Sequence, residues 1–425
     1  MAVSACSTGD NGKDDGDGTT PGSGFGWTVD TSKCADPKAA TEKIDGTINV
    51  GTVMPLSGSV ASAYAPLRTG MEAFFAYTNA NNPIPNHPIK LHVGDDQYNP
   101  AMTPSAVNTL LDQGAQVFAG IVGTPSNMAV RELLNQNCVP QLHASTGGPA
   151  LNDVAKYPWT SGQTAPFDVE GQIWATKIKQ DFPAGAKVAT FLANSSVGSD
   201  TGGGFQSEAA KLGIEIVSKQ TIEPTQTTPP TAQLNAIAAS KAPAIFAVPL
   251  GSQCGTFLKE LANVKAANAG WTPQVYLTST CAFQSVLAAA GPAANGVIAA
   301  SSYLDTGDTS VVAGNKELTY LKEQLTKSGQ EKGIAVAAVG WAVADILTAA
   351  LRKAAASPAG LTQASILEAH RTIDYHSSVM RPGVNARMSG DKDDVLIQSL
   401  QIIKFDATAS KFTDMGALIT SFESS

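Results

Sequence analysis

The stretch that decides the fold is INVGTVMPLSG, residues 48–58. Its first part is mostly apolar, as in a strand that is covered on both faces, and a small Ser-Gly turn follows it. A helical pattern, TGMEAFFAYTNA, then begins near residue 69. Open α/β sheets bind their ligands where a strand passes through a short loop into a helix, so this junction is a candidate binding edge.

The same alternation of strand and helix recurs along the chain and predicts an α/β fold. Strands are expected at 48–56, 88–96, 116–123, 139–145, 186–194, 214–222, 242–250 and 273–280. Helices are expected at 69–80, 102–114 and 126–137, and from near residues 202, 230 and 253. Apolar strands in a β-α-β rhythm predict parallel sheets covered on both faces. Two successive sets of them predict two doubly wound lobes.

The last third of the chain does not begin a third lobe. One more strand is expected at 296–305, helices at 314–327, 334–356 and 361–372, and a final strand at 396–406. We therefore expect the chain to cross between the lobes three times, which makes a hinge. The predicted division is a tether, disordered in part, at 1–45, a first lobe of 46–163 plus 300–372, and a second lobe of 164–299 plus 373–425.

Charge and hydropathy exclude two classes of function. The 425 residues carry 28 Lys and Arg against 36 Asp and Glu, a net charge of -8. Nucleic-acid binding needs a basic surface, so a DNA or RNA partner is not expected. Residues 333–351 are almost long enough and apolar enough to span a bilayer, but Asp345 lies among them, and we interpret them as a buried helix.

The N-terminus predicts a lipid anchor. Residues 3–6 read VSAC, which resembles the end of a bacterial lipoprotein signal, so Cys6 is the expected site of lipidation and Met1 an artificial start. Residues 7–26 are rich in Gly, Ser, Asp and Thr, and such a segment is expected to be a flexible tether. The predicted location is the outer face of the cell membrane. The alternative is an ordinary cysteine in a disordered tail.

Four cysteines remain besides Cys6, and in an oxidising compartment they allow three pairings. Cys254 and Cys281 each follow a strand, and if these strands are neighbours the two cysteines lie at one sheet edge. Cys34 precedes the first strand of the first lobe, and Cys138 precedes another strand of that lobe. We favour the disulfides Cys34–Cys138 and Cys254–Cys281, with a nucleophilic Cys254 as the alternative.

Several motifs, in order, resemble one family. They are PLSG at 55–58, Gly70, TNANN at 78–82, VGDDQYNP at 93–100, GTPSNMAV at 123–130 and VPQLHASTGGPAL at 139–151. From about residue 46 onward the chain resembles solute-binding proteins of ABC transporters with the type I periplasmic fold, within them the leucine/isoleucine/valine-binding family. The resemblance implies two lobes, joined by three strands, that close over a solute and deliver it to a membrane permease. It also implies a protein that is a monomer, needs no cofactor and is not an enzyme.

The resemblance implies that the first lobe holds a ligand carboxylate with hydroxyls and amides at two strand ends. The residues expected there are Thr124, Ser126, Ser145, Thr146 and Gly147, with Tyr64 as an aromatic from the opening loop. Each has a plainer interpretation. Ser126 can be a helix N-cap, residues 145–147 a polar turn, and Tyr64 a packed loop aromatic.

In the second lobe the expected ligand contacts are Val197, Leu250 and Thr280. This lobe departs from the family pattern. Val197 stands near the place of a usual tyrosine, and no acidic residue follows the strand at 273–280. Because an ammonium group buried without a carboxylate is unfavourable, we hypothesise a solute without an α-amino group, with an apolar or aromatic body. Asp305 is the alternative partner for an ammonium group.

Other chemistry has weaker signals. The five histidines show no metal-ligand spacing, and Asp95 and Asp96 are expected to cap turns. The glycine-rich run at 196–205 lacks a phosphate-loop ending and is interpreted as a flexible lip of the second lobe. A ligand-sensing receptor domain and a hydrolase stay as alternative functions.

Overall fold

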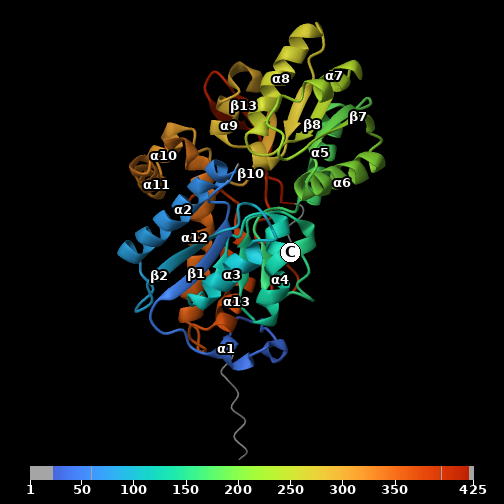
Figure 1. The fold of residues 1–425 in the computed structure, drawn as a ribbon. Coiled ribbons are helices and arrows are strands. Elements are labelled where there is room, and N and C mark those ends of the chain that lie inside the picture. The colour runs from blue at the N-terminus through green and yellow to red at the C-terminus, as the bar shows by residue number, and fades with distance from the viewer. Residues whose placement is uncertain (1–22, 59, 394, 421–425) are drawn as a thin grey trace, which may run out of the picture.

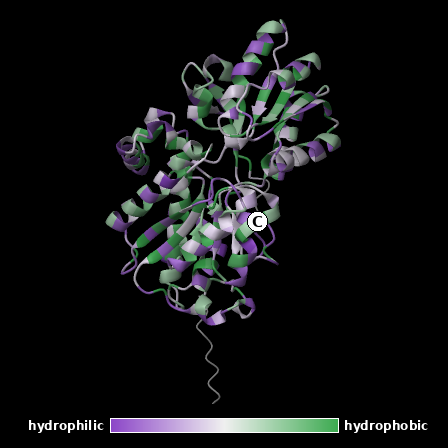
Figure 2. Cartoon of the chain, in the orientation of Figure 1, coloured by the Kyte–Doolittle hydropathy of each residue, from purple (hydrophilic) through white to green (hydrophobic). Residues whose placement is uncertain are grey.

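Two lobes, one above the other in Figure 1, make up the protein. The computed structural model describes residues 23–58, 60–393 and 395–420. Each lobe is a sheet between layers of helices, and apolar residues concentrate on the strands and on the helix faces toward them (Figure 2). The predicted α/β fold of two lobes is confirmed.

The first lobe contains a five-stranded parallel sheet in the order β2-β1-β3-β4-β5. Its strands are β1 (Ile48–Met54), β2 (Ile89–Asp95), β3 (Val117–Ala119), β4 (Gln141–Ala144) and β5 (Thr160–Gly162). The helices α3 (Thr103–Asp112) and α4 (Thr124–Gln136) cover one face, where Val107 and Val130 pack on Phe118. The other face packs on α2 (Ala61–Asn81), α12 (Ile334–Ala355) and α13 (Gln363–Arg371).

The second lobe contains a seven-stranded sheet in the order β14-β13-β10-β9-β8-β6-β7. The parallel strands are β6 (Lys187–Ala193), β7 (Glu215–Ile222), β8 (Ala244–Val248), β9 (Gln274–Leu277) and β10 (Ile298–Ser301). The strands β13 (Gln401–Asp406) and β14 (Lys411–Asp414) extend it in antiparallel fashion. Its helices are α5 (Phe167–Asp181), α6 (Ser196–Lys211), α7 (Thr231–Ala239), α8 (Gln253–Ala267) and α9 (Gln284–Ala288).

Smaller elements complete the lobes. They are α1 (Pro37–Thr41), α10 (Thr309–Ala313), α11 (Lys316–Lys327), the β11–β12 pair (Asp374–Tyr375 with Ala386–Arg387), and five 3-10 turns, η1 (Thr31–Lys33), η2 (Pro149–Leu151), η3 (Ser279–Cys281), η4 (Gly291–Ala294) and η5 (Glu331–Gly333). Most of the buried apolar side chains from Ile373 to Ile397 belong to the core around α12, and the chain joins the second sheet at Gln401. The predicted division instead assigned 373–425 to the second lobe.

The chain crosses between the lobes at three places, and the three crossings are hydrogen-bonded to one another. The first follows β5, the second follows β10, and the third leads into β13. The Ile397 amide donates to the Gln163 carbonyl (2.9 Å), and the Gln163 side-chain amide donates to the Tyr303 hydroxyl (3.0 Å). The Ser302 hydroxyl donates to the Ser399 carbonyl (2.6 Å).

Glycines allow the main helix pairs to pack at backbone distance. A Cβ atom placed on Gly70 of α2 would lie 1.9 Å from the Ala337 carbonyl oxygen of α12, and one on Gly340 would lie 2.0 Å from the Leu67 oxygen. In the second lobe, a Cβ atom placed on Gly204 of α6 would lie 1.9 Å from the Asp168 carbonyl oxygen of α5. The prediction of a flexible glycine-rich lip is therefore wrong, because residues 196–205 are helical and their glycines serve packing.

The structured part of the chain begins earlier than predicted. Ser23 is buried and donates a hydrogen bond to Glu368, and the amide of Ala35 donates to the carbonyl of Gln136 (2.7 Å). The expected flexible segment, which ran to Gly26, is thus wrong for residues 23–26. Cys6 and most of that segment lie outside the described residues.

One helical stretch in the described part of the chain, Glu331–Ala355, is long and apolar enough to cross a membrane by length and composition. In the structure 72% of its most apolar window is buried. Its Trp341 packs edge-on against Phe74 of α2, with ring centroids 5.1 Å apart. This segment has the surroundings of a core helix, as predicted.

Candidate functional site

The ends of β3 and β4 form one polar edge of the first lobe. Val122 and Ser145, just beyond these strands, form a parallel bridge. The hydroxyl oxygens of Thr124 and Thr146 lie 2.6 Å apart, and the Thr146 oxygen accepts the Gly148 amide (3.3 Å). Because one threonine donates to the other, the hydroxyl proton of the second is left available at this edge.

Ser126 does not cap α4. The N-cap position is Gly123, which has φ 90° and no side chain to accept a hydrogen bond, and Ser126 lies in the first turn. Ser126 is only 2% exposed, and its hydroxyl donates to Asp96 (2.8 Å). The same carboxylate accepts from the Thr103 hydroxyl (2.8 Å) and the Tyr98 amide (3.0 Å). The donor of Ser126 is therefore already engaged within the lobe.

Both acidic residues at the end of β2 hold turns, as expected. Asp95 accepts from the amide of Leu56 (2.9 Å) and from the hydroxyl of Ser57 (2.5 Å), so it fixes the PLSG loop after β1. Asp96 fixes the following turn, in which Gln97 and Tyr98 both have positive φ.

Tyr64 lies in the helix α2, not in a loop, because α2 begins at Ala61. Its ring stacks on Tyr98, with centroids 5.9 Å apart and planes 17° apart, and burial raises the pKa of both hydroxyls. A Cβ atom on Gly123 would lie 2.8 Å from the Tyr98 ring, so this ring covers the start of α4. Sequence reasoning missed Tyr98, although it belongs to the quoted VGDDQYNP motif.

Ser145 and Gly147 connect the polar edge to the first crossing. The Ser145 hydroxyl donates to the Gln163 side-chain oxygen (3.3 Å), and Gln163 in turn contacts Tyr303. A Cβ atom on Gly147 would lie 2.4 Å from the Ala165 carbonyl oxygen. The Gly147 carbonyl accepts the Phe167 amide (2.7 Å). This close contact is possible because Gly147 has no side chain.

On the second lobe, Val197 lies in the first turn of α6, Leu250 follows β8, and Thr280 follows β9; all three are half-buried. The Thr280 hydroxyl is buried and has no hydrogen-bond partner in the described part of the chain. An acidic residue does reach this region, from α5. The buried carboxylate of Glu170 accepts from the Ser279 amide (2.6 Å) and hydroxyl (2.7 Å), and burial raises its pKa.

Two further carboxylates lie near the start of α5 and α6. One carboxylate oxygen of Asp168 is buried without a partner in the described structure. Burial, together with the charge of Asp168, raises the pKa of Asp200. Asp168 follows Phe167, whose amide binds Gly147 of the first lobe. Sequence reasoning missed this pair because it did not predict α5.

Both predicted disulfides are present. Cys34 and Cys138 have Cα atoms 5.5 Å apart, and Cys254 and Cys281 have Cα atoms 5.8 Å apart. The neighbouring strands β8 and β9 bring the second pair together. A disulfide-bonded Cys254 is not a free thiol nucleophile.

The histidines do not form a metal site in the described residues, where no group of three or more His, Cys, Asp or Glu could hold a metal ion. His143 and His370 are instead buried side by side in the first lobe. Nδ1 of His143 lies 3.1 Å from the Val343 carbonyl, its Nε2 lies 3.2 Å from Nδ1 of His370, and Nε2 of His370 lies 2.8 Å from the Ser161 hydroxyl. Burial lowers the pKa of His143 to about 4 and that of His370 well below its usual value.

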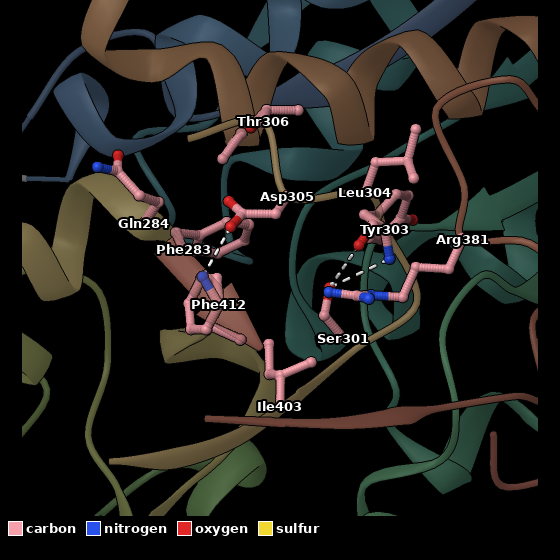
Figure 3. A pocket seen from close by; sticks show the side chains of 12 residues that line it. Phe283, Gln284, Ser301, Tyr303, Leu304, Asp305, Thr306, Arg381, Ile403 and Phe412 are labelled. Carbon is pink, nitrogen blue, oxygen red and sulfur yellow. Dashed lines mark hydrogen bonds between the residues drawn. The ribbon is translucent and has the colours of Figure 1, made fainter. Parts of the chain in front are cut away.

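A hollow lies between the lobes beside the second crossing (Figure 3). Its empty volume, including space open to solvent, is about 310 Å³. Asp305 lines it and accepts from the Phe412 amide (2.7 Å) and the Gly307 amide (3.0 Å), and burial raises its pKa. Apart from Asp305, the alternative partner for an ammonium group, none of the residues predicted to bind the solute lines this hollow.

Sequence relatives match part of the chain, and solved structures share its fold. A leucine/isoleucine/valine-binding protein homolog of Brucella melitensis is 25% identical over 182 residues, which are 42% of this chain and about half (48%) of the relative. A branched-chain amino acid ABC transporter protein of Thermus thermophilus with bound valine has a TM-score of 0.77 at 19% identity, covering 89% of this chain and 97% of that one. A solute-binding protein of Rhodopseudomonas palustris BisB5 in complex with 3,4-dihydroxybenzoic acid has a TM-score of 0.74 at 19% identity, covering 89% and 98%.

The sequence profile of one family covers most of the chain. That profile, described as periplasmic binding protein, matches residues 47–410, which include every strand of both sheets except β14. The chain belongs to the periplasmic binding protein family.

Proposed function

We propose that the protein is the extracytoplasmic solute-binding component of an ABC importer and holds a small organic carboxylate between its lobes. The observation that carries this proposal is the polar edge at β3 and β4. It faces the second lobe beside three hydrogen-bonded crossings, and α4 contacts α6 across the gap. Closing two lobes over a solute would create the form that a permease recognises.

The first lobe is suited to a carboxylate. The start of α4 has no side-chain cap, so the amides of Thr124 and Ser126 and the positive dipole end of the helix are left for an anion, beside the Tyr98 ring. The Thr124–Thr146 pair adds one hydroxyl donor. The stacked Tyr64 and Tyr98 supply an aromatic wall at the same edge, which suits a solute with an apolar or aromatic body.

We keep the hypothesis that the solute has no α-amino group. Glu170 reaches Ser279, the neighbour of Thr280, and already accepts two hydrogen bonds from it. The solved neighbours include one protein with valine and one with dihydroxybenzoic acid, so both kinds of solute occur on this fold.

An amino-acid solute is the second candidate, and the Asp168–Asp200 pair favours it. An ammonium group bound there would give the buried Asp168 oxygen a partner and would lower the raised pKa of Asp200. Asp305 needs such a partner less, because each of its oxygens already accepts one backbone amide, whereas one oxygen of Asp168 has no partner in the described structure.

Isothermal titration calorimetry with leucine and 4-methylpentanoate separates the two candidates, because these compounds differ only in the α-amino group. The proposal expects the acid to bind at least tenfold more tightly, and benzoate to bind as well. Tight binding of leucine alone would support the amino-acid candidate. Thr146→Val should weaken binding of every carboxylate about tenfold, whereas Thr348→Val, in the buried middle of α12, serves as the control.

Further parts of the proposal concern the protein's surroundings. Cys6 would carry the lipid that keeps a monomeric binding protein beside its permease. The alternative function is that of a ligand-sensing receptor domain with the same fold. The protein is proposed to release its solute unchanged, and mass spectrometry after incubation with esters and amides of the bound acid tests this, since a cleaved product would show a hydrolase.

A further inference from the structure

The hollow beside the second crossing is built by both lobes and by the crossing itself. Phe283, Ile403 and Phe412 of the second lobe supply apolar walls, and Ala335 at the start of α12 closes the first-lobe side. Tyr303 and Asp305 come from the crossing. A group that fills this hollow therefore contacts both lobes, so its binding would favour one arrangement of the hinge over others.

Two polar side chains in this hollow are almost completely buried and keep an atom without a partner in the described structure. Thr306 is 6% exposed, and its hydroxyl makes no hydrogen bond. Arg381 is 8% exposed; one end of its guanidinium pairs with Asp414, but its Nε has no acceptor. Figure 3 shows the two side chains at opposite ends of the hollow, with Asp305 between them.

Buried donors without acceptors are rare because each forfeits its hydrogen bonds to water. Both ends of the hollow therefore lack an acceptor atom. A hydrocarbon group placed there would leave both donors unpaired. An oxygen atom would accept from Arg381 Nε or from the Thr306 hydroxyl.

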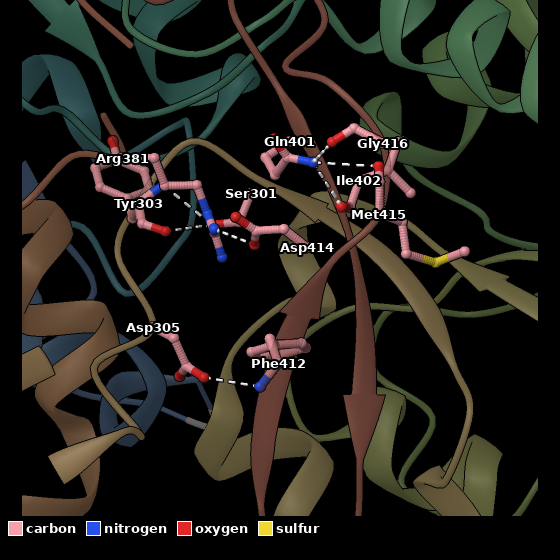
Figure 4. A network of polar contacts seen from close by, with 10 residues as sticks. All are labelled: Ser301, Tyr303, Asp305, Arg381, Gln401, Ile402, Phe412, Asp414, Met415 and Gly416. Carbon is pink, nitrogen blue, oxygen red and sulfur yellow. Dashed lines mark hydrogen bonds and ion pairs between the residues drawn. The ribbon is translucent and has the colours of Figure 1, made fainter. Parts of the chain in front are cut away.

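The charges around the hollow decide which oxygen-bearing group fits. Arg381 is paired with Asp414, and Asp305 adds a second carboxylate (Figure 4). Arg381 lies close enough to Asp305 to counteract part of the rise in the pKa of that carboxyl. A second carboxylate on the solute would meet more negative than positive charge here, whereas an uncharged hydroxyl can accept from Arg381 or Thr306 and donate to Asp305.

The hollow is connected to the candidate carboxylate site. Ser145 of the polar edge contacts Gln163, and Gln163 donates to the hydroxyl of Tyr303, which lines the hollow. We propose that the hollow is a specificity subsite for an uncharged, hydroxyl-bearing end of the solute whose carboxylate lies at the first-lobe edge. This inference rests on the proposed function and narrows its solute class to hydroxy acids.

Calorimetry with matched acids tests the inference. The pairs are benzoate with 4-hydroxybenzoate and pentanoate with 5-hydroxypentanoate; terephthalate is the doubly charged counterpart. In at least one pair the hydroxy acid is expected to bind about tenfold more tightly, since one buried hydrogen bond separates the members. Terephthalate is expected to bind more weakly than 4-hydroxybenzoate.

Two variants assign the preference to the hollow. Thr306→Val removes the hydroxyl while keeping the shape, and Arg381→Lys keeps the charge that pairs with Asp414 but removes Nε. At least one of them is expected to reduce the tenfold preference to less than threefold while changing the affinity for the deoxy acid by less than threefold. Thr52→Val is the matched control, because Thr52 also has a buried, unpartnered hydroxyl but lies in β1, away from the hollow.

The outcomes separate this inference from the proposed function. If no acid of either pair binds, the proposed solute class fails, and the inference fails with it. If the acids bind but both members of each pair bind equally, the inference alone is overturned. If the variants lower only thermal stability and leave the preference unchanged, the hollow holds ordered water, which also overturns the inference.

Discussion

The helices of the two lobes pack by the same device, but the two edges that face each other differ. In the first lobe, Gly70 and Gly340 bring α2 and α12 into backbone contact; in the second, Gly171 and Gly204 do the same for α5 and α6. At the facing edges, the first lobe gives Ser126, Ser145 and the Thr124–Thr146 pair partners of their own. The second lobe leaves an oxygen of Asp168 and the hydroxyl of Thr280 unpartnered in the described structure.

This difference indicates that the two edges have different roles in binding a solute. An edge whose polar groups already have partners keeps its shape without a solute, and is ready to accept one. Buried polar atoms without partners need an acceptor or donor from outside, which a solute supplies when the lobes close. We therefore expect the first lobe to bind first and the second lobe to discriminate.

The largest expected effect comes from the disulfides and differs between the lobes. Replacing both cysteines of the Cys34–Cys138 pair by serine should lower the free energy of unfolding by about 5 kcal/mol, and of the Cys254–Cys281 pair by about 3.5 kcal/mol, because the first closes a longer loop. The separations are 104 and 27 residues. Urea denaturation measures both values, and a larger loss for the second pair would contradict the loop-length argument.

Neighbouring glycines of α6 test the packing device. Gly204→Ala should lower the free energy of unfolding by about 3 kcal/mol, because the added Cβ would lie 1.9 Å from the Asp168 oxygen. Gly203→Ala is the control, since no atom lies within 4 Å of its Cβ position. It should stabilise the protein by about 0.5–1 kcal/mol through helix propensity. Urea denaturation that showed the same sign for both variants would refute this account.

The polar difference between the edges can be tested by stability. Asp96→Asn should lower the free energy of unfolding by about 2 kcal/mol, because an amide cannot accept from Thr103, Ser126 and Tyr98 together. Thr280→Val should change it by less than about 0.5 kcal/mol, because the hydroxyl has no bond to lose. Thermal and urea unfolding of the solute-free protein check both, and equal losses would remove the distinction between the lobes.

Acid should affect the first lobe through its histidine pair. His143 and His370 stay neutral in the folded protein because burial lowers their pKa values, whereas the histidines of the unfolded chain bind protons below their usual pKa near 6.5. Their contribution to stability is thus lost as pH falls from about 6.5 toward 4. His143→Gln should make the slope of unfolding free energy against pH shallower by about 1 kcal/mol per pH unit in this range.

Urea denaturation at several pH values measures that slope for both proteins. Asp345 titrates in the same range, since burial raises its pKa to about 6, but it is present in both proteins and its effect cancels in the difference. Identical slopes in the two proteins would show that His143 takes up protons in the folded state.

The regular alternation of strands and helices was predicted better than the elements that depart from it. β1 through β4 and β6 through β9 were expected from the alternation of strands and helices, and β1 and β8 show the near-continuous apolar run of a buried parallel strand. α5 was missed because its polar and glycine residues concealed its buried face, which includes Gly171 and Trp174. β14 is a short edge strand with a mixed pattern, so it lacks the apolar run that marked the others.

The positions of the candidate residues at strand ends could be predicted from the sequence, but their hydrogen-bond partners could not. Ser145 and Thr146 lie at the expected strand ends, because that follows from the alternation of strands and helices. The partner of Ser126 could not be predicted, since Asp96 comes from a different strand end. The hollow was missed for the same reason, because Arg381 and Thr306 are far apart in sequence and line one hollow only because of the crossings.

The central claim is that a solute carboxylate lies between the lobes at the first-lobe edge. A crystal structure of the protein with the tightest-binding acid from the titrations tests it most directly. Our account predicts the carboxylate within hydrogen-bonding distance of the Thr124–Thr146 pair and the first turn of α4, with the body of the acid enclosed by the second lobe. An acid bound on an outer surface, or bound while the space between these edges holds only solvent, would contradict it.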